Sequence, residues 1–202
     1  MLLTAPERHD VRPAQRGRPR DASRDEVLRR ATLEVMAEVG YRALTMDAVA
    51  ARARAGKATI YRRWESKLEL VIDVTNHLAK SELPDPDTGS TTRDLREFLY
   101  SYADFLTGVA GRAAQTLVGE LPHEPELAKA FRTAFLLSQQ TILERILERG
   151  RQRGEVRPDV PVCLVAELAG GALLHRLMLS AKPLDRGFVD HLVDQVLLPV
   201  LT

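Results

Sequence analysis

A group of basic residues surrounds a Thr-Ile-Tyr segment near the N-terminus. From Arg52 to Lys67 the chain carries six cationic side chains and one acidic side chain. Residues 1–67 contain 15 Lys and Arg against 9 Asp and Glu, whereas residues 68–202 contain 14 against 19. Clustered Lys and Arg attract phosphates. The asymmetry therefore predicts an N-terminal part that binds a polyanion and an acidic remainder with a different role.

Two short helices joined by a three-residue turn are predicted within this basic segment. Thr45 is a suitable N-cap for a helix over 46–53, residues 54–56 form the turn, and a second helix covers 57–64. Ile60 falls where the second helix needs a buried residue. The pattern is that of a helix-turn-helix DNA-binding motif. Taken alone, it also fits two amphipathic helices of a larger bundle.

The outward face of the second helix favours DNA. Ile60 and Trp64 are four residues apart and face inward. Small Ala58 and Thr59 would allow close approach to base edges, and Tyr61 offers a hydroxyl to a phosphate. The candidate DNA contacts read from this face and from the start of the next helix are Lys57, Ala58, Thr59, Tyr61, Arg62, Arg63 and Lys67.

Two motifs in this region carry a specific resemblance. They are T-x-x-x-V-A-x-x-A, beginning at Thr45, and K-A-T-I-Y-R-R-W-x-S-K-x-x-L, beginning at Lys57. With them, residues 23–71 resemble the DNA-binding domain of the TetR family of bacterial repressors. The resemblance implies a three-helix DNA-binding domain, a fourth helix that links it to a ligand-binding domain, and a homodimer. It also places family DNA contacts at Thr45, Lys57, Ala58, Thr59, Tyr61, Arg63 and Lys67.

The turn departs from the family pattern. The family usually has Gly at the first turn position, where this chain has Arg54, and often Ser at the third position, where it has Gly56. A non-glycine residue with a positive φ is uncommon. We therefore expect the motif itself but leave the geometry of its turn open.

The whole chain is expected to be all-α, with about nine helices, because no stretch shows sustained period-two alternation. We expect a flexible basic arm over 1–22 and a helix-turn-helix domain over 23–68, followed through a linking helix at 66–81 by a ligand-binding and dimerisation domain over 82–202. The further helices are predicted at 92–109, 111–119, 125–149, 161–180 and 187–201.

The N-terminal arm contains the sequence Gln-Arg-Gly-Arg-Pro-Arg. Its Arg-Gly-Arg-Pro-Arg core resembles an AT-hook, so that Arg16, Arg18 and Arg20 could enter the minor groove of an A·T tract. The alternative is a disordered tail with general attraction for phosphate. In either case the arm would add affinity more than sequence selection.

The last two predicted helices are apolar around much of their circumference, which favours a dimer interface over an intramolecular core. A patch of small residues in the first of them would allow close helix approach. The candidate interface residues are Ala166, Ala169, Gly170, Leu173, Leu177, Val193, Val196, Leu197 and Val200.

Candidate ligand contacts come from the helices between the linker and this interface. Tyr and His side chains can supply polar points in an otherwise apolar pocket, although each residue alone also fits a core or surface position. The candidates are Tyr100, Tyr102, Phe105, Gln115, His123, Phe131, Phe135 and His175.

Catalytic, cofactor and metal motifs are absent from the sequence. The five histidines are scattered, the lone Cys163 lies in an apolar run, and there is no glycine-rich phosphate loop or nucleophile elbow. No signal peptide or membrane span is recognised. We expect a cytoplasmic protein that is not an enzyme and has no cofactor.

The predicted function is a homodimeric transcriptional regulator, a repressor that binds a pseudo-palindromic operator in double-stranded DNA and is released by a small apolar molecule. Two alternatives stay open. One is a DNA-binding architectural or activating protein that needs no ligand, and the other is a helical ligand carrier or enzyme that kept the N-terminal domain as a relic.

Overall fold

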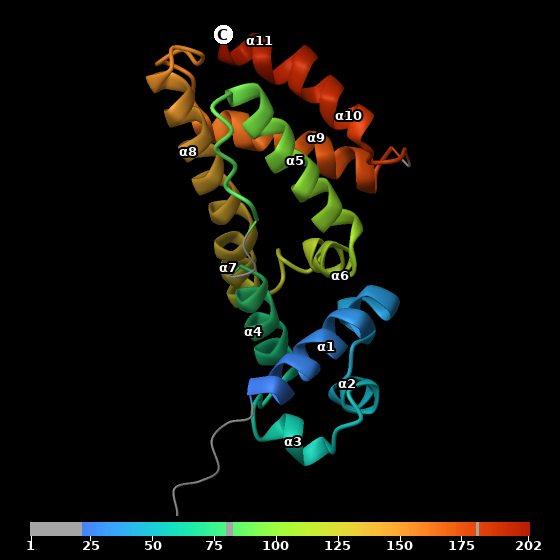
Figure 1. Cartoon of the computed structure of the whole chain (residues 1–202). Coiled ribbons are helices and arrows are strands. Elements are labelled where there is room, and N and C mark those ends of the chain that lie inside the picture. Colours follow the sequence, from blue (N-terminus) through green and yellow to red (C-terminus); the bar gives the residue numbers. More distant parts are fainter. Residues whose placement is uncertain (1–21, 80–82, 181) are drawn as a thin grey trace, which may run out of the picture.

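The computed structural model describes residues 22–79, 83–180 and 182–202, and every regular element in these ranges is a helix (Figure 1). Two π-helical segments lie within longer helices, so the described residues form nine continuous rods. The predicted all-α fold is confirmed. No helix among them is long and apolar enough to cross a membrane.

The N-terminal domain consists of α1 (Ala22–Ala43), α2 (Met46–Arg52), α3 (Lys57–Tyr61) and α4 (Lys67–Ala79). The C-terminal domain begins with α5 (Thr91–Thr107) and α6 (Val109–Val118). A long rod follows, made of α7 (Pro125–Phe131), the π-helix η1 (Arg132–Leu137) and α8 (Ser138–Gln152). The chain ends with α9 (Val162–Met178) and with a rod of α10 (Arg186–Leu192), the π-helix η2 (Val193–Leu197) and α11 (Leu198–Leu201).

Two side-chain caps, one of them predicted at Thr45, fix the starts of helices in the N-terminal domain. The Thr45 hydroxyl accepts a hydrogen bond from the Ala48 amide at 3.1 Å and caps α2. Before α4, the Ser66 hydroxyl accepts from the Glu69 amide at 3.1 Å, and the Glu69 carboxylate accepts from the Glu65 amide at 2.6 Å. The Ser66 bond is one half of a capping box, whereas the Glu69 carboxylate binds the amide of the residue before the cap.

Gly40 marks a kink in α1. Its φ of 79° is left-handed, which glycine adopts without steric cost. Helical hydrogen bonding resumes beyond it and continues to Ala43. The kink redirects the chain toward α2, and Tyr41 and Leu44 are buried just after it.

The apolar core of the N-terminal domain extends into the C-terminal domain. The core of the N-terminal domain includes Leu28, Met36, Ile60 and Leu70, and it also takes in Ala113 and Leu117 of α6 and Leu127 of α7. Helix α1 lies across α6, and α4 lies against α7 (Figure 1). The N-terminal domain is therefore packed on the C-terminal domain and is not tethered to it through α4 alone.

The start of α6 packs closely against the backbone at the end of α5, and this contact requires glycine at position 111. A Cβ atom at this position would lie 2.3 Å from the Phe105 carbonyl oxygen. Nearby, the Arg42 guanidinium donates to the Glu120 carboxylate at 2.7 Å and joins the end of α1 to the segment after α6. These contacts fix the position of α6 against α1.

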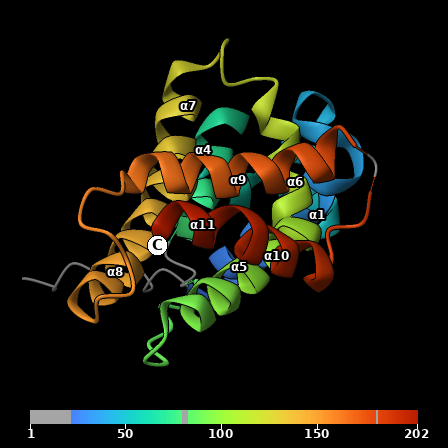
Figure 2. The same ribbon diagram turned by 90° about the horizontal axis from the view of Figure 1, so that it is seen from above.

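The C-terminal core is built from α5, α8, α9 and the α10–α11 rod, and Figure 2 shows α9 and this rod together on the face turned toward the viewer. Four residues predicted for the dimer interface, Ala169, Leu173, Val193 and Leu197, are at most 1% exposed and pack inside this core. A second copy of the chain cannot reach them. For these four residues, the intramolecular core is the correct interpretation.

Some helix boundaries differ from those predicted. Helix α3 ends at Tyr61 rather than near Trp64, because the chain turns there to place Trp64 in the core. The rod predicted for 125–149 continues to Gln152 and contains η1. The sequence gives no obvious signal for the wider π-helical turn.

A carboxylate distant in sequence caps α5. Ser90 precedes this helix but makes no side-chain cap. Instead, the Glu155 carboxylate accepts a hydrogen bond from the Thr91 amide at 2.7 Å. Hydrogen bonds from the Thr91 side chain and amide, together with the charge of Arg153, lower the pKa of Glu155.

We expect Glu155→Ala to lower the free energy of unfolding by about 0.5–1 kcal/mol at pH 7, the usual effect of losing a helix cap. Because the folded state has the lower pKa, the difference should be complete above the unfolded value of about 4.3 and should disappear as the pH falls through the folded value. Urea unfolding of both proteins between pH 7 and pH 3 measures it. Glu97→Ala, an exposed change on α5 that removes no cap, should change stability at pH 7 by less than about 0.5 kcal/mol.

Candidate DNA-reading face and effector cavity

The turn before α3 adopts the strained conformation that the sequence left open. Arg54 has a φ of 49°, in the left-handed region that glycine usually occupies. The Ala55 amide donates to the Ala50 carbonyl at 2.9 Å and closes the turn. Gly56 then caps α3 with an extended backbone. The helix-turn-helix geometry is formed with arginine in place of glycine.

Helix α3 presents the expected face. Ile60 is fully buried and Trp64 is 5% exposed, whereas Tyr61 is 50% exposed. Ala58 is exposed beside Tyr61, and Thr59 is half-buried. The face therefore combines small side chains for close approach with one aromatic hydroxyl, a composition suited to the major groove.

Lys57, at the start of α3, is held by an acid of the preceding helix. Its Nζ atom lies 2.5 Å from Oδ2 of Asp47, and both side chains are more than half exposed. The hydrogen bond and the charge of Asp47 raise the pKa of Lys57. Lys57 is therefore positively charged at neutral pH. A DNA phosphate could replace Asp47 as its partner, because both side chains are exposed.

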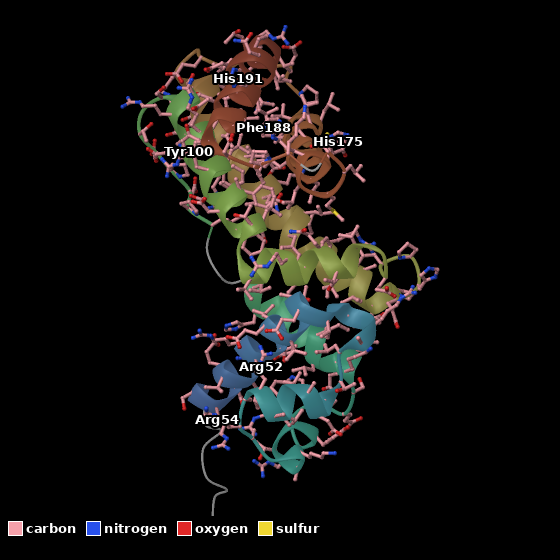
Figure 3. The ribbon with its side chains drawn as sticks, turned by 90° about the vertical axis from the view of Figure 1, so that its right-hand side faces the viewer. Arg52, Arg54, Tyr100, His175, Phe188 and His191 are labelled. Atoms are coloured by element: carbon pink, nitrogen blue, oxygen red, sulfur yellow. The ribbon has the colours of Figure 1, made fainter. Side chains whose placement is uncertain are left out.

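Two arginines of the basic segment are exposed and make no ion pair within the described ranges. Arg62 lies at the end of α3. Arg54 lies in the turn, at the outer edge of the N-terminal domain in Figure 3. By contrast, Arg52 is bound by Glu34 and Glu38 of α1. The sequence did not single out Arg54 as a contact, although its place in the turn was a usable signal.

Arg63 and Lys67 have roles within the domain. Arg63 is half-buried, pairs with the Asp25 carboxylate and donates to the Thr59 carbonyl at 3.1 Å. Lys67 donates to the carbonyls of Tyr41 and Arg42 at 3.0 and 3.3 Å, and its ammonium lies 4.4 Å from the centre of the Tyr41 ring. Both cations hold α1, α3 and α4 together, so neither is free in the way predicted. Arg16, Arg18 and Arg20 lie outside the described residues.

A cavity of about 610 Å³ lies where the end of α4 meets η1, α8 and the segment that follows α4. This volume is typical of small-molecule sites. Its apolar wall consists of Leu78, Leu83, Pro84, Phe105, Ala134, Phe135 and Ile142. The Phe105 and Phe135 rings lie 5.7 Å apart and are tilted by 40°. The π-helical turn of η1 carries Phe135 into this wall.

Gln139, Ser138 and Thr141 belong to the polar wall of the cavity. Gln139 is 8% exposed, and its Nε2 atom has no hydrogen-bond partner. The hydroxyls of Ser138 and Thr141 donate to carbonyls of their own helical rod, at Thr133 and Leu137. Gln139 is a site residue that the sequence analysis missed, because η1 shifts the register of α8.

An ion-pair cluster borders the cavity. Asp85 accepts hydrogen bonds from Arg145 and Arg149 of α8, each at 3.0 Å. Burial raises the pKa of Asp85, but the hydrogen bonds from Arg149 and Arg145 outweigh it and lower the pKa. The positive charge of Arg145 at the cavity wall is therefore already matched by a carboxylate.

The predicted ligand contacts divide into two groups. Phe105 and Phe135 line the cavity. Tyr102 stacks on Phe105 from the core side, and Phe131 packs 4.8 Å from Phe135. Burial raises the pKa of Tyr102, and the neighbouring Gln139 amide opposes this only in part, so the phenol stays uncharged.

The other four candidates lie outside this cavity. The Tyr100 hydroxyl donates to Asp190 of α10, and the Gln115 amide donates to the Leu106 carbonyl at 2.9 Å. His123 is exposed in the turn before α7, and His175 is exposed on α9 (Figure 3). These four predicted ligand contacts do not line the cavity described here.

Helix α9 and the last rod carry an exposed apolar surface. Leu164, Leu168 and Leu179 of the α9 region are 55%, 39% and 76% exposed, and Val196 and Val200 of the last rod are 37% and 36% exposed. Of the other predicted interface residues, Ala166, Gly170 and Leu177 are partly exposed. We call the five residues with stated exposures, together with Met178, the α9 surface. Exposed apolar side chains gathered on neighbouring helices often mark a protein–protein interface.

A reading helix in a helix-turn-helix domain, joined to a helical domain with a cavity, defines a DNA-binding regulator. Residues 28–74 match the family model described as bacterial regulatory proteins, tetR family. Residues 85–196, more than half of the chain, match the tetracyclin repressor-like C-terminal domain. The chain belongs to the TetR family of helix-turn-helix transcriptional regulators.

Relatives extend along nearly the whole chain. An uncharacterised HTH-type regulator of Bacillus subtilis, YdeS, is 32% identical over 89% of this chain and 91% of its own length. The DNA-binding transcriptional repressor TetR of Mycobacteroides abscessus is 34% identical over 90% and 96%. The crystal structure of the TetR-family regulator SCO0332 is 31% identical, covers 90% of this chain and 100% of that one, and has a TM-score of 0.67.

We expect Arg63→Ala to lower the free energy of unfolding by about 1–3 kcal/mol, because it leaves the half-buried Asp25 carboxylate without its partner. Chemical denaturation measures the effect. Arg62→Ala removes the neighbouring exposed arginine and should change stability by less than about 0.5 kcal/mol. Equal stability of the two variants would show that Arg63 is an ordinary surface cation.

Proposed function

We propose that this regulator is a homodimeric repressor that binds a pseudo-palindromic operator and is released when a small, largely apolar molecule occupies the C-terminal cavity. The observation that carries the proposal is the outward face of α3, whose small and aromatic residues are flanked by unpaired arginines. We further propose a cytoplasmic location, where such a protein meets DNA, and a role without catalysis.

On DNA, the two α3 helices would enter successive major grooves. Ala58 and Thr59 would meet base edges and thymine methyl groups, and the Tyr61 hydroxyl would donate to a phosphate. Thr45 would contact the backbone from the start of α2. Lys57 and Arg62 would supply phosphate contacts, and Arg54 is added to this set because the turn exposes it without a partner. Arg63 and Lys67 would position α3 and α4 rather than touch DNA.

The dimer would form through the α9 surface. Glycines 170 and 171 leave open space along this helix, so a partner helix could approach closely. The patch is made of long apolar side chains on two neighbouring rods, as in helical packing between subunits. Two reading helices held at a fixed spacing are what a palindromic site requires.

Release by a ligand is supported by the position of the cavity. Its wall includes Leu78, near the end of α4, the helix that leads directly from the DNA-binding domain. Among similar structures, one is a flavonoid-responsive regulator and another is FadR from Bacillus subtilis with stearoyl-CoA, at 23% and 21% identity. A coupling of about 1–3 kcal/mol between ligand and DNA would be enough for regulation.

Two alternative functions predict different results. A ligand-independent architectural or activating protein would keep the same DNA affinity whatever occupies the cavity. A helical carrier would bind its ligand without selective DNA binding. The sign of regulation is tested by reporter expression with and without the protein.

In a titration at two salt concentrations, we expect the upstream intergenic DNA to bind about 10³-fold more tightly than an unrelated fragment. Arg62→Ala should weaken binding to both fragments by a similar factor and reduce the slope of log affinity against log salt by about one per protomer. Tyr61→Ala should weaken operator binding more than non-specific binding if it fixes the position of α3.

The matched control is Arg112→Ala, which removes an exposed arginine from α6 in the C-terminal domain. It should leave both affinities and the salt slope unchanged. Equal, weak binding of both fragments by the wild type would call for a genome-wide selection of bound DNA. Loss of preference there as well would rule out sequence-specific reading.

The dimer is tested by placing a charge on the α9 surface. We expect the wild type to have twice the mass of the 22.5 kDa chain by light scattering, and Leu168→Glu with Val196→Glu to shift it to one chain, because buried carboxylates lacking partners oppose association. Val109→Glu, at a similarly exposed residue of α6, should leave the dimer intact. A double variant that stays dimeric would place the interface elsewhere.

A further inference from the structure

We infer that the effector is an amphipathic anion, a hydrocarbon body that ends in one carboxylate, and that Arg145 binds this carboxylate at one end of the cavity beside α4. The inference rests on the proposed function, in which this cavity holds the effector. It adds the chemical class of the ligand and the residue that selects it.

The cavity has an apolar body and a charged end. Phe135, Ile142 and Arg145 follow one another along the rod of α7, η1 and α8, and all three line the cavity. The distance along a helix from Phe135 to Arg145 is roughly 10–15 Å. Asp85 is the other charged residue of the wall. An elongated molecule would therefore place its apolar body against Phe135 and Ile142 and its polar end at Arg145.

Arg145 has hydrogen-bonding capacity that the protein does not use. Within the described ranges its guanidinium makes one hydrogen bond, from Nη1 to the Asp85 carboxylate at 3.0 Å. The Nε and Nη2 groups are left without a protein acceptor, and the side chain is 59% exposed, so a ligand can reach it. A guanidinium binds a carboxylate through two parallel hydrogen bonds. A carboxylate is therefore the acceptor that matches Arg145.

The neighbouring Arg149 is held by the protein where Arg145 is not. It donates to the Pro86 carbonyl at 2.6 Å and to Asp85 at 3.0 Å, and it lies 3.6 Å from the Asp87 carboxylate. Its side chain is 22% exposed. These bonds fasten the segment that follows α4 beside α8 (Figure 1). Arg149 therefore holds this segment, and Arg145 is left to bind a ligand.

The balance of charge at this end of the cavity favours an anion over a cation. Asp85 is one carboxylate shared by two guanidinium groups, Arg145 and Arg149. Asp87, the further partner of Arg149, is 63% exposed and is not part of the cavity wall. A cationic head group would have to compete with both arginines for Asp85. A carboxylate would instead take up the bonds that Arg145 has left over.

The apolar wall would supply most of the affinity and Arg145 the selectivity. The tilted rings of Phe105 and Phe135 offer contacts to a hydrocarbon body, and about 610 Å³ can accommodate one. An exposed ion pair adds little affinity, but it distinguishes molecules that have the same body. Because a carboxylate is harder to remove from water than a hydroxyl, apolar binding alone would favour an alcohol over the matching acid.

The test uses dansylaminoundecanoate, a fluorescent fatty acid whose emission shifts to the blue in apolar surroundings. We expect it to bind the full-length protein in the absence of DNA. In competition, decanoate should displace it about three- to tenfold more effectively than decanol, which has the same chain without the charge. Decylamine, with the opposite charge, should be the weakest competitor. The preference for decanoate should decrease at high salt, because salt screens an exposed ion pair.

Variants connect this preference to Arg145. Arg145→Gln should remove the advantage of decanoate over decanol, whereas Arg112→Gln, the same change at an exposed arginine of α6, should preserve it. Asp85→Asn should increase the advantage, because it leaves Arg145 and Arg149 without their shared carboxylate. All three changes lie outside the N-terminal domain, so an unchanged operator affinity without ligand would show that the variants are folded.

The inference is overturned if the probe does not bind, if decanol competes as well as decanoate, or if decylamine competes best. It is also overturned if Arg145→Gln and Arg112→Gln behave alike, or if Asp85→Asn fails to raise the preference. Release of operator DNA is measured separately. A carboxylate that binds through Arg145 without releasing DNA would reject the proposed regulation and leave the binding site standing. Release by a molecule of another class would do the reverse.

Discussion

Packing of α6 against α1 is the contact on which the rest of the molecule depends. The N-terminal domain does not complete its own core, since Ala113 and Leu117 of α6 and Leu127 of α7 lie within it. Protein interiors are close-packed and do not deform continuously. A movement of α6 or α7 would therefore carry the reading helix with it, and α4 is a second connection in parallel with this one.

Charge in the DNA-binding domain is divided between two tasks. Arg63 and Lys67 are bound within the domain and hold α1, α3 and α4 in place. Arg54 and Arg62 stay exposed at the turn and at the end of the reading helix. A count of basic residues does not distinguish the two kinds. The distinction comes from three-dimensional partners such as Asp25, which is 38 residues from Arg63 in sequence.

Local signals in the sequence predicted local structure well. Thr45 caps the helix it was expected to cap, because capping involves residues a few positions apart. The spacing of buried Ile60 and Trp64 likewise identified the inward face of the reading helix. The all-α fold followed from the same short-range periodicity.

Features that depend on distant contacts were not predictable. Glu155 caps α5 from 64 residues away, and no short-range pattern announces it. Ala169 and Leu173 were assigned to a dimer interface because apolar periodicity does not tell an intramolecular neighbour from a partner. The aromatic part of the cavity was found in Phe105 and Phe135, but Gln139 was missed because its orientation depends on η1.

The π-helical turn η1 has a consequence for how the chain tolerates changes in length. A π-helix holds an extra residue relative to the α-helical path, and such turns arise within α-helices at functional sites. Removing one residue between Arg132 and Leu137 would let the rod close into a continuous α-helix. One residue corresponds to a rotation of about 100°, so Phe135 and Gln139 would no longer face the same space. Relatives that differ here by a single insertion or deletion would then present a different lining to their ligands with α8 otherwise intact.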